Sequence, residues 1–469
     1  MSSTVQKNSV IANLRKAALL VFLTAAAGWF TTFLGDQISA KQVIAVSTFI
    51  CIISATLLFW DMRLAVAFIG ISVMLGANVT SLGEMMENTE LHIILFLVGM
   101  MTLVGVLKDL GLFTWLIQAI LNRKNMTGRR FMFILIFLSG IMASLVDEVT
   151  SIVFVLALVF QVCDTLKIRP VRFVLVSVLA TNIGSTGTML GNPVGLLIGT
   201  KMERSFGDFL VHATPIMLVS LVVTLAILMV WMRKDIALFD ERLAGRRAGY
   251  IGLGPLVRIP YRRGLVILLC ALVFISLHSW MESQLGLAHN TMLIVAPLTI
   301  SGILMIYRHK RARHYIEAEV EWWTLLFFLV LFAVAGALKT TGVTDVIAER
   351  FTSVFGTNKF ILTPLIVAVT AIGSAFVDNI VFVAAFIPII GKLVATHPEL
   401  EPLTWAMLFG SCFGGNITAI GSTANIVALG MMEKRYGIHI AFWEWLKIGA
   451  VVGFVTSAVA TIVILLFYY

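Results

Sequence analysis

Residues 90–111 read ELHIILFLVGMMTLVGVLKDLG, and residues 321–342 read EWWTLLFFLVLFAVAGALKTTG. The two stretches align 231 residues apart, and the aligned identities include Glu90 with Glu321, Phe96 with Phe327, Gly105 with Gly336, Leu107 with Leu338, Lys108 with Lys339 and Gly111 with Gly342. An apolar segment that recurs at a fixed offset indicates an internal repeat. This pair of stretches therefore predicts that the chain is built from two similar halves.

The same register continues along the chain. Val146-Asp147 aligns with Val377-Asp378 at the same offset, and GSTGTMLG at 184–191 aligns with GGNITAIG at 414–421 one residue earlier. Five predicted spans separate equivalent elements, and an odd number inverts the second half relative to the first. Inverted repeats are typical of carriers with a site near the membrane midplane, lined by discontinuous helices.

Composition agrees with a membrane protein. The chain has 469 residues, of which 59% are hydrophobic and 13% charged, and its mean hydropathy is +0.99. Soluble domains are about 45–50% apolar and about 25% charged. We predict an all-α polytopic fold with about eleven transmembrane helices, at about 17–35, 42–60, 63–78, 91–108, 173–200, 208–231, 264–280, 291–307, 322–339, 402–430 and 446–468.

Several function classes are excluded by the same pattern. The net charge of +9 is spread over short segments between apolar runs, so it indicates topology and not a nucleic-acid partner. The four cysteines have no CxxC spacing, and no P-loop, zinc motif or Ser/His/Asp triad is recognisable. We therefore predict no enzymatic activity.

Two further apolar regions, at about 131–163 and 360–391, are too long for one helix and are interrupted midway by acids. Lys and Arg flank the first region on both sides, which places both of its ends in the cytoplasm. We predict a re-entrant hairpin for each region, since such backbone is tolerated at membrane depth only within protein or beside water. The N-terminus is predicted to be cytoplasmic and the C-terminus external, in the cell (inner or plasma) membrane.

The predicted organisation in chain order is an N-terminal extra helix at 1–36, a first repeat at 37–232, a basic cytoplasmic linker at 233–263 and a second repeat at 264–469. Each repeat holds one hairpin and one broken helix, the latter at about 173–200 and at about 402–430.

The first candidate site residues are at the hairpin tips: Asp147, Glu148, Asp378 and Asn379. An acid at the bilayer centre costs about 2.5–3.5 kcal/mol on insertion scales, so it indicates a cavity, a bound cation or a proton relay. The alternative, an acid neutralised by a nearby base, finds no Lys or Arg between residues 131 and 163.

The second candidate group lies in two Gly-rich loops that interrupt spans in matching positions, at 184–195 and 414–425. Its members are Thr186, Thr188, Asn192, Asn416, Thr418, Ser422, Thr423 and Asn425. Freed carbonyls and Thr or Asn oxygens suit Na⁺, and helix N-termini suit an anion or polar solute. For any single hydroxyl the alternative is a bond to its own helix backbone. A Na⁺ is predicted near Asp147, Thr188, Asp378 and Thr418, with no other cofactor.

At these residues the chain resembles the ion transporter superfamily, especially its arsenite permease, melanosomal P-protein and citrate-transporter-like group. The resemblance is carried by FLVGMM at 96–101 through Gly111, by the Val-Asp hairpin tips, and by GNP at 191–193 and GSTAN at 421–425. It implies two inverted repeats meeting at a central site, movement like an elevator, and a homodimer. The chain departs from the family pattern at Glu148, where Asn is usual, and at Val194-Gly195, where Pro-Asn is usual.

Two functional hypotheses remain. The first is a secondary active carrier of a small inorganic or carboxylate solute, such as an oxyanion or arsenite, coupled to H⁺ or Na⁺. The second is a Na⁺/H⁺ antiporter with no other solute. Acids at the tips repel a multivalent anion unless cations neutralise them, which favours a cation or a neutral solute such as arsenous acid.

Overall fold

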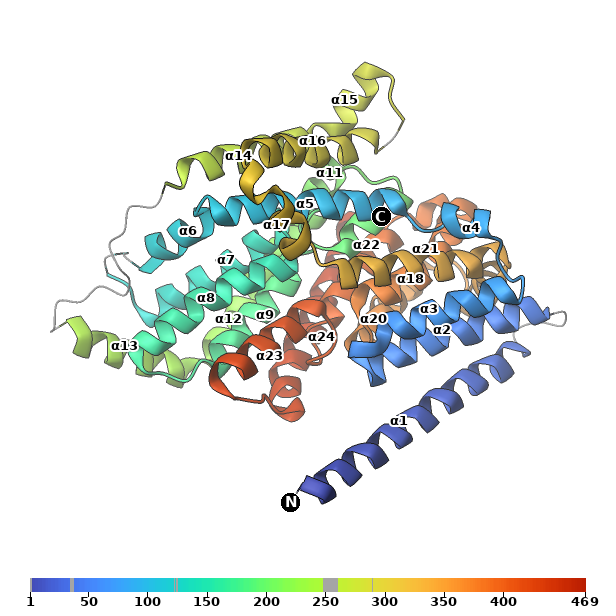
Figure 1. The fold of residues 1–469 in the computed structure, drawn as a ribbon, viewed down its shortest axis with the longest axis horizontal. Helices are drawn as coiled ribbons and strands as arrows, with labels where there is room; N and C mark the ends of the chain where they lie inside the picture. Colours follow the sequence, from blue (N-terminus) through green and yellow to red (C-terminus); the bar gives the residue numbers. More distant parts are fainter. Residues whose placement is uncertain (1, 34–37, 122, 124, 248–259, 289) are drawn as a thin grey trace. The chain divides into compact units, whose positions relative to one another are not determined.

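The computed structural model describes residues 2–33, 38–121, 123, 125–247, 260–288 and 290–469. Within these ranges every regular element is a helix (Figure 1). Ten helices are long and apolar enough to cross a membrane, or up to twelve if each of two bent pairs counts as one span. The predicted all-α polytopic fold with about eleven spans is therefore confirmed.

The chain forms two compact units that do not coincide with the two predicted repeats. The first unit comprises Met1–Ile94, Glu321–Leu362 and Ile380–Leu403, and the second comprises Leu95–Val320, Thr363–Asn379 and Thr404–Tyr469. Each unit takes residues from both halves of the sequence. Segments far apart in the chain therefore share one core.

The first unit holds α1 (Ser2–Thr31), α2 (Ala40–Leu58), α3 (Arg63–Gly76), α4 (Leu82–Glu87), α18 (Trp322–Thr340) and α19 (Val343–Phe355). In this unit α1 packs along α2, α2 along α3, and α3 along α18 (Figure 1). The guanidinium of Arg63 is buried between aromatic rings, 3.8 Å from the centroid of Trp60. Its Nη2 donates to Thr324 Oγ1 at 3.2 Å, which joins α3 to α18.

The chain passes between the units within α5 (Leu91–Asp109), α20 (Lys359–Phe376) and α21 (Asn379–Thr396). The other helices of the second unit are α6 (Leu112–Leu121), α7 (Gly128–Leu145), α8 (Glu148–Leu166), α9 (Val171–Gly184), α10 (Pro193–Lys201), α11 (Phe206–Asp208), α12 (Thr214–Trp231), α13 (Arg233–Arg247), α14 (Arg262–Ser276), α15 (His278–Leu285), α16 (Thr291–Tyr307), α17 (Ala312–His314), α22 (Leu403–Gly414), α23 (Thr423–Tyr436) and α24 (Phe442–Phe467). Short 3-10 turns lie at Trp60–Met62, His309–Arg311 and Pro398–Leu400, and π-helical turns at Phe209–Ala213 and Tyr315–Glu319.

Helix ends follow the register found in the sequence. Helices α5 and α18 begin at 91 and 322, α7 and α20 at 128 and 359, and α8 and α21 at 148 and 379, each pair 231 residues apart. Helices α10 and α23 begin at 193 and 423, which is 230 residues apart. The two offsets are those of the aligned sequence motifs.

Some spans differ from the prediction. The predicted spans at about 173–200 and 402–430 are each two helices separated by non-helical loops. Conversely, each arm of the two hairpins is 18 or 19 residues long and is by itself a candidate span. At 1.5 Å per residue such an arm is about 27 Å long, close to the thickness of the hydrocarbon core.

Helices α6, α13 and α19 were not predicted, because hydropathy windows detect long apolar runs and not short or polar helices. Helix α13 occupies the first half of the predicted linker at 233–263, and residues 248–259 of that linker lie outside the described residues.

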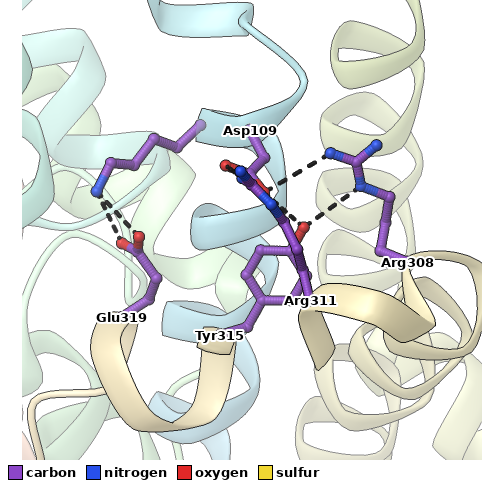
Figure 2. Close-up of polar contacts among 6 residues, drawn as sticks. Asp109, Arg308, Arg311, Tyr315 and Glu319 are labelled. Carbon is purple, nitrogen blue, oxygen red and sulfur yellow. Dashed lines mark hydrogen bonds and ion pairs between the residues drawn. The ribbon is translucent and has the colours of Figure 1, made fainter. Parts of the chain in front are cut away.

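An ionic cluster fixes the end of α5 within the second unit. Figure 2 shows the Asp109 carboxylate between Arg308, Arg311 and Tyr315. Arg311 Nη1 lies 2.6 Å from both carboxylate oxygens, and the Tyr315 hydroxyl donates to Oδ2 at 2.7 Å. The neighbouring Lys108 pairs with Glu319 at 3.0 Å. These contacts hold the turn after α16, where the helix axis bends by 104°.

Candidate functional site

Every predicted site residue lies in the second unit. The first hairpin tip is the two-residue break between α7 and α8. Asp147 is the N-cap of α8, and its Oδ1 accepts from the Thr150 backbone N–H at 2.7 Å. A carboxylate in this position satisfies a free N–H and interacts favourably with the helix dipole. The local fold of the hairpin therefore already employs the Asp147 carboxylate.

Glu148 has a different environment from its neighbour. It is the first residue of α8 and is 3% exposed. Its Oε1 accepts a long hydrogen bond from Ser422 Oγ at 3.4 Å, and its Oε2 has no hydrogen-bond partner among the described residues. The charges that act on it most are those of Asp378 and Asp147, and no Lys, Arg or His in the described part of the chain forms an ion pair with it. The position where the family usually has Asn thus holds a buried acid in an acidic environment.

The second hairpin tip brings another acid to the same place. Asp378 lies just before α21, is 2% exposed, and accepts from Thr423 Oγ1 at 2.6 Å. Asn379, the first residue of α21, is also buried. Ser422 and Thr423 are adjacent, so the start of α23 contacts the acids of both hairpins.

The first Gly-rich loop is closed by Asn192, the N-cap of α10. Its Oδ1 accepts from the Gly195 backbone N–H at 2.7 Å, and its Nδ2 donates to Ser185 Oγ at 2.8 Å. The same amide lies 3.2 Å from Cys412 Sγ, on α22. The loops of the two halves therefore contact each other.

A triad of asparagines links the loops more directly. Asn182 Nδ2 donates to Asn416 Oδ1 at 2.9 Å and to Asn425 Oδ1 at 2.8 Å. Asn425 Nδ2 in turn donates to the carbonyls of Gly415 and Thr418. All three asparagines are at most 1% exposed. The Asn182 Oδ1 has no hydrogen-bond partner within the described residues.

Three predicted hydroxyls bond to backbone. Thr186 Oγ1 donates to Ile183 O at 2.7 Å within its own turn. Thr188 donates to Ser144 O, and its repeat equivalent Thr418 donates to Ala375 O. The last two bonds join each loop to the first arm of its own hairpin. The alternative weighed for single hydroxyls therefore describes these three threonines, while Ser422 and Thr423 contact carboxylates.

Two glycines allow the loops to approach the hairpins. A Cβ on Gly184 would lie 2.2 Å from backbone atoms of Gly140, and one on Gly414 would lie 2.3 Å from the carbonyl oxygen of Ala371. Real Cβ atoms do not approach backbone so closely, so only glycine fits. The pattern of contacts is again repeated between the halves.

Sequence reasoning missed Asn182, Ser185 and Cys412. Asn182 is an amide within the apolar segment of α9, and an uncharged polar residue at membrane depth is a usable signal. The repeat alignment concealed it, because the residue 230 positions later is Cys412 and carries no amide.

The arrangement gathers four helix N-termini, those of α8, α10, α21 and α23, with carboxylates, amides and hydroxyls at their first residues. Helix N-termini carry partial positive charge, and they stabilise carboxylates and other anions. The named polar side chains of the site include no basic group. The site is thus suited to bind cations at its acids and small polar solutes at its helix ends.

Comparison with known proteins agrees with this geometry. The family described as "Citrate transporter" matches residues 49–410 and 341–469. An uncharacterized transporter of Mycobacterium tuberculosis is 34% identical over 380 residues, covering 80% of this chain and 86% of the relative, and a second from the same organism is 31% identical over 410 residues, covering 85% and 92%.

More distant relatives share the same region. The P protein of Mus musculus is 26% identical over 94% of this chain and 61% of its own length. The crystal structure of the YdaH transporter of Alcanivorax borkumensis shares the fold, with a TM-score of 0.55 and 14% identity over 81% of this chain and 86% of that chain. With its family match over most of its length, this chain is a multi-pass membrane transporter and belongs to the citrate transporter family.

Proposed function

We propose that the protein is a secondary active transporter that moves a small carboxylate or inorganic solute, such as an oxyanion or arsenite, coupled to H⁺ or Na⁺. The observation that carries the proposal is the buried pair Glu148 and Asp378, held at the start of α23 by Ser422 and Thr423. Burying a carboxylate without an opposite charge is costly, so a proton or a bound cation is required at Glu148. Coupling follows when occupancy of this position alters access to the site.

Two buried oxygens support a cation at the site. Glu148 Oε2 and Asn182 Oδ1 are acceptors without a hydrogen-bond partner in the described part of the chain. A buried acceptor without a donor calls for a water or an ion. We therefore include a bound Na⁺ in the proposal, near the hairpin acids.

The family description favours a carboxylate as the solute. Citrate carries up to three negative charges, and the site already holds acids, so an anion of this kind would enter with compensating cations. The helix N-termini of α10 and α23 would face its carboxylates. Arsenous acid, neutral at pH 7, avoids the repulsion and remains a candidate.

The alternative is a Na⁺/H⁺ antiporter with no other solute. The absence of basic groups among the named site residues favours it, since an anion carrier commonly uses Arg or Lys to hold its substrate. The two functions are separated by whether Na⁺ drives proton movement when no other solute is present.

The proposal also covers topology. Basic residues at both ends of the first hairpin support a re-entrant arrangement with cytoplasmic ends, a cytoplasmic N-terminus and an external C-terminus. Alternating access then arises from movement of one unit against the other, in an elevator-like manner, within a homodimer. Reporter fusions at both termini and the mass of the detergent-solubilised protein test these two points.

Transport assays in proteoliposomes test the function. Uptake of citrate, arsenite and oxyanions is measured with imposed Na⁺ and pH gradients, for the native protein, Glu148→Gln and Asp378→Asn. Glu433→Gln is the matched control, because this acid also lies on α23 but is exposed. The proposal predicts gradient-driven uptake that both site variants lose and the control keeps. Full gradient-driven uptake by both site variants would contradict it.

A further inference from the structure

A cavity of about 550 Å³ lies within the second unit, away from the hairpin tips, where α7 begins and α12 ends. Its lining includes Arg123, Arg129, Arg130, Phe133, Leu225 and Met229. The cavity thus has a basic side and an apolar side. Its volume is in the range of pockets that hold small ligands.

The basic side is not neutralised by protein. No acid among the described residues forms an ion pair with Arg123, Arg129 or Arg130. Arg130 Nη1 donates to the Asn125 carbonyl at 2.8 Å, which fixes its side chain against the loop before α7. The neighbouring acid Asp240 accepts from the Gly128 backbone N–H at 2.7 Å and so already serves the N-terminus of α7. The guanidinium groups remain available to an anion.

The apolar side continues along the membrane-facing helices. Both α7 and α12 belong to candidate spans, so the cavity lies where two spans end. Phe133 on α7 is 51% exposed, and Val222 on α12, about one turn from Leu225, is 54% exposed. Phe133 also packs on Phe137, one turn further along α7. Exposed apolar side chains therefore lead from the cavity toward the middle of the spans.

We propose that this cavity binds an anionic phospholipid, with the phosphate held by the arginines and the start of an acyl chain lying over Phe133, Leu225 and Met229. Guanidinium groups pair with phosphate oxygens in a bidentate manner, and basic pockets between membrane helices are suited to lipid headgroups. A soluble phosphate ester would use only the basic side. The apolar lining and its continuation along α7 and α12 select the lipid.

Native mass spectrometry of the full-length protein in detergent tests the proposal. The protein is titrated with palmitoyl-oleoyl phosphatidylglycerol, with the zwitterionic phosphatidylcholine of the same chains, and with glycerol 1-phosphate as competitor. We expect tighter retention of phosphatidylglycerol than of phosphatidylcholine. The double variant Arg129→Gln/Arg130→Gln should lower phosphatidylglycerol affinity by about fivefold for each arginine.

The control is Lys167→Gln/Arg169→Gln, which removes two exposed positive charges from the loop between α8 and α9. Phe133→Ser tests the apolar side and should weaken the phospholipid without improving the soluble ester. An equal loss in the control would show a general surface-charge effect and overturn the proposal. Competition by glycerol 1-phosphate as strong as that by the phospholipid would also overturn it, since it would leave a small-anion site.

Discussion

Ser422 Oγ lies 3.4 Å from Glu148 Oε1, although the two residues belong to different halves of the sequence and are 274 positions apart. The next residue, Thr423, donates to Asp378 at 2.6 Å. One helix start therefore contacts the acids of both hairpins. Any change in the protonation or cation occupancy of either acid acts on the same turn of α23, which gives the fold a direct connection between ion binding and the broken helix.

Glu148→Gln should remove the coupling ion from the site. The amide keeps the size of the side chain and a hydrogen bond to Ser422, but it carries no charge and releases no proton at any working pH. We expect gradient-driven uptake to fall by roughly tenfold or more, as for loss of a charge-assisted contact, and its pH dependence to flatten. Initial rates between pH 5.5 and 8.5 in proteoliposomes measure this. Unchanged rates with an unchanged pH profile would count against a role for Glu148.

Thr423→Val should weaken coupling through Asp378. Valine keeps the shape and removes the donor to Oδ2, so a buried carboxylate oxygen loses its short hydrogen bond. The apparent affinity for the coupling ion should change by roughly tenfold, and Thr423→Ser should restore it because the hydroxyl returns. Thr352→Val is the control, since its hydroxyl bonds only to the backbone of α19. The concentration dependence of uptake on Na⁺ and on H⁺ provides the measurement.

Asp147 should tolerate Asn better than Ala. Asparagine is as good an N-cap as aspartate, whereas alanine cannot accept from the Thr150 N–H and costs about 1 kcal/mol. Thermal unfolding in detergent should therefore show a lower midpoint for Asp147→Ala than for Asp147→Asn. Asp147→Asn should also retain more transport than Glu148→Gln. A complete loss of transport in a well-folded Asp147→Asn variant would instead assign the carboxylate a direct part in ion binding.

Asn182→Ala should loosen the contact between the two loops. The substitution leaves Asn416 Oδ1 and Asn425 Oδ1 without their donor in a buried environment, which costs about 1–3 kcal/mol for each acceptor left unsatisfied. The unfolding midpoint should fall, and transport should fall with it. Asn290→Ala, at a buried asparagine outside the site, is the comparison. An equal effect on transport in both variants would reduce Asn182 to a general packing residue.

Gly184→Ala and Gly414→Ala should each disrupt folding. An added Cβ would overlap backbone of the hairpin arm at 2.2 and 2.3 Å, so helices must separate. Gly430→Ala is the matched control, because nothing lies within 4 Å of its added Cβ on α23, and helix propensity there favours Ala by about 1 kcal/mol. Yield and monodispersity in detergent distinguish the variants. Normal yields for both Gly184→Ala and Gly414→Ala would mean that the hairpins pack less closely than described.

The sequence by itself determined the membrane class, the two-fold register and the positions of the helix breaks. Hydropathy and repetition are local properties, so residues 146–147, 185–192 and 415–422 could be identified as interruptions without knowing what they contact. The family resemblance came from these same short motifs.

Only the tertiary structure decided which polar side chains share the site. Thr188 and Ser422 have similar sequence contexts, yet one bonds to the backbone of its own hairpin and the other reaches Glu148 in the opposite half. Asn182, unremarked in the sequence, joins both loops. The direction of a side chain depends on how helices from distant segments pack, and neither hydropathy nor spacing records that packing.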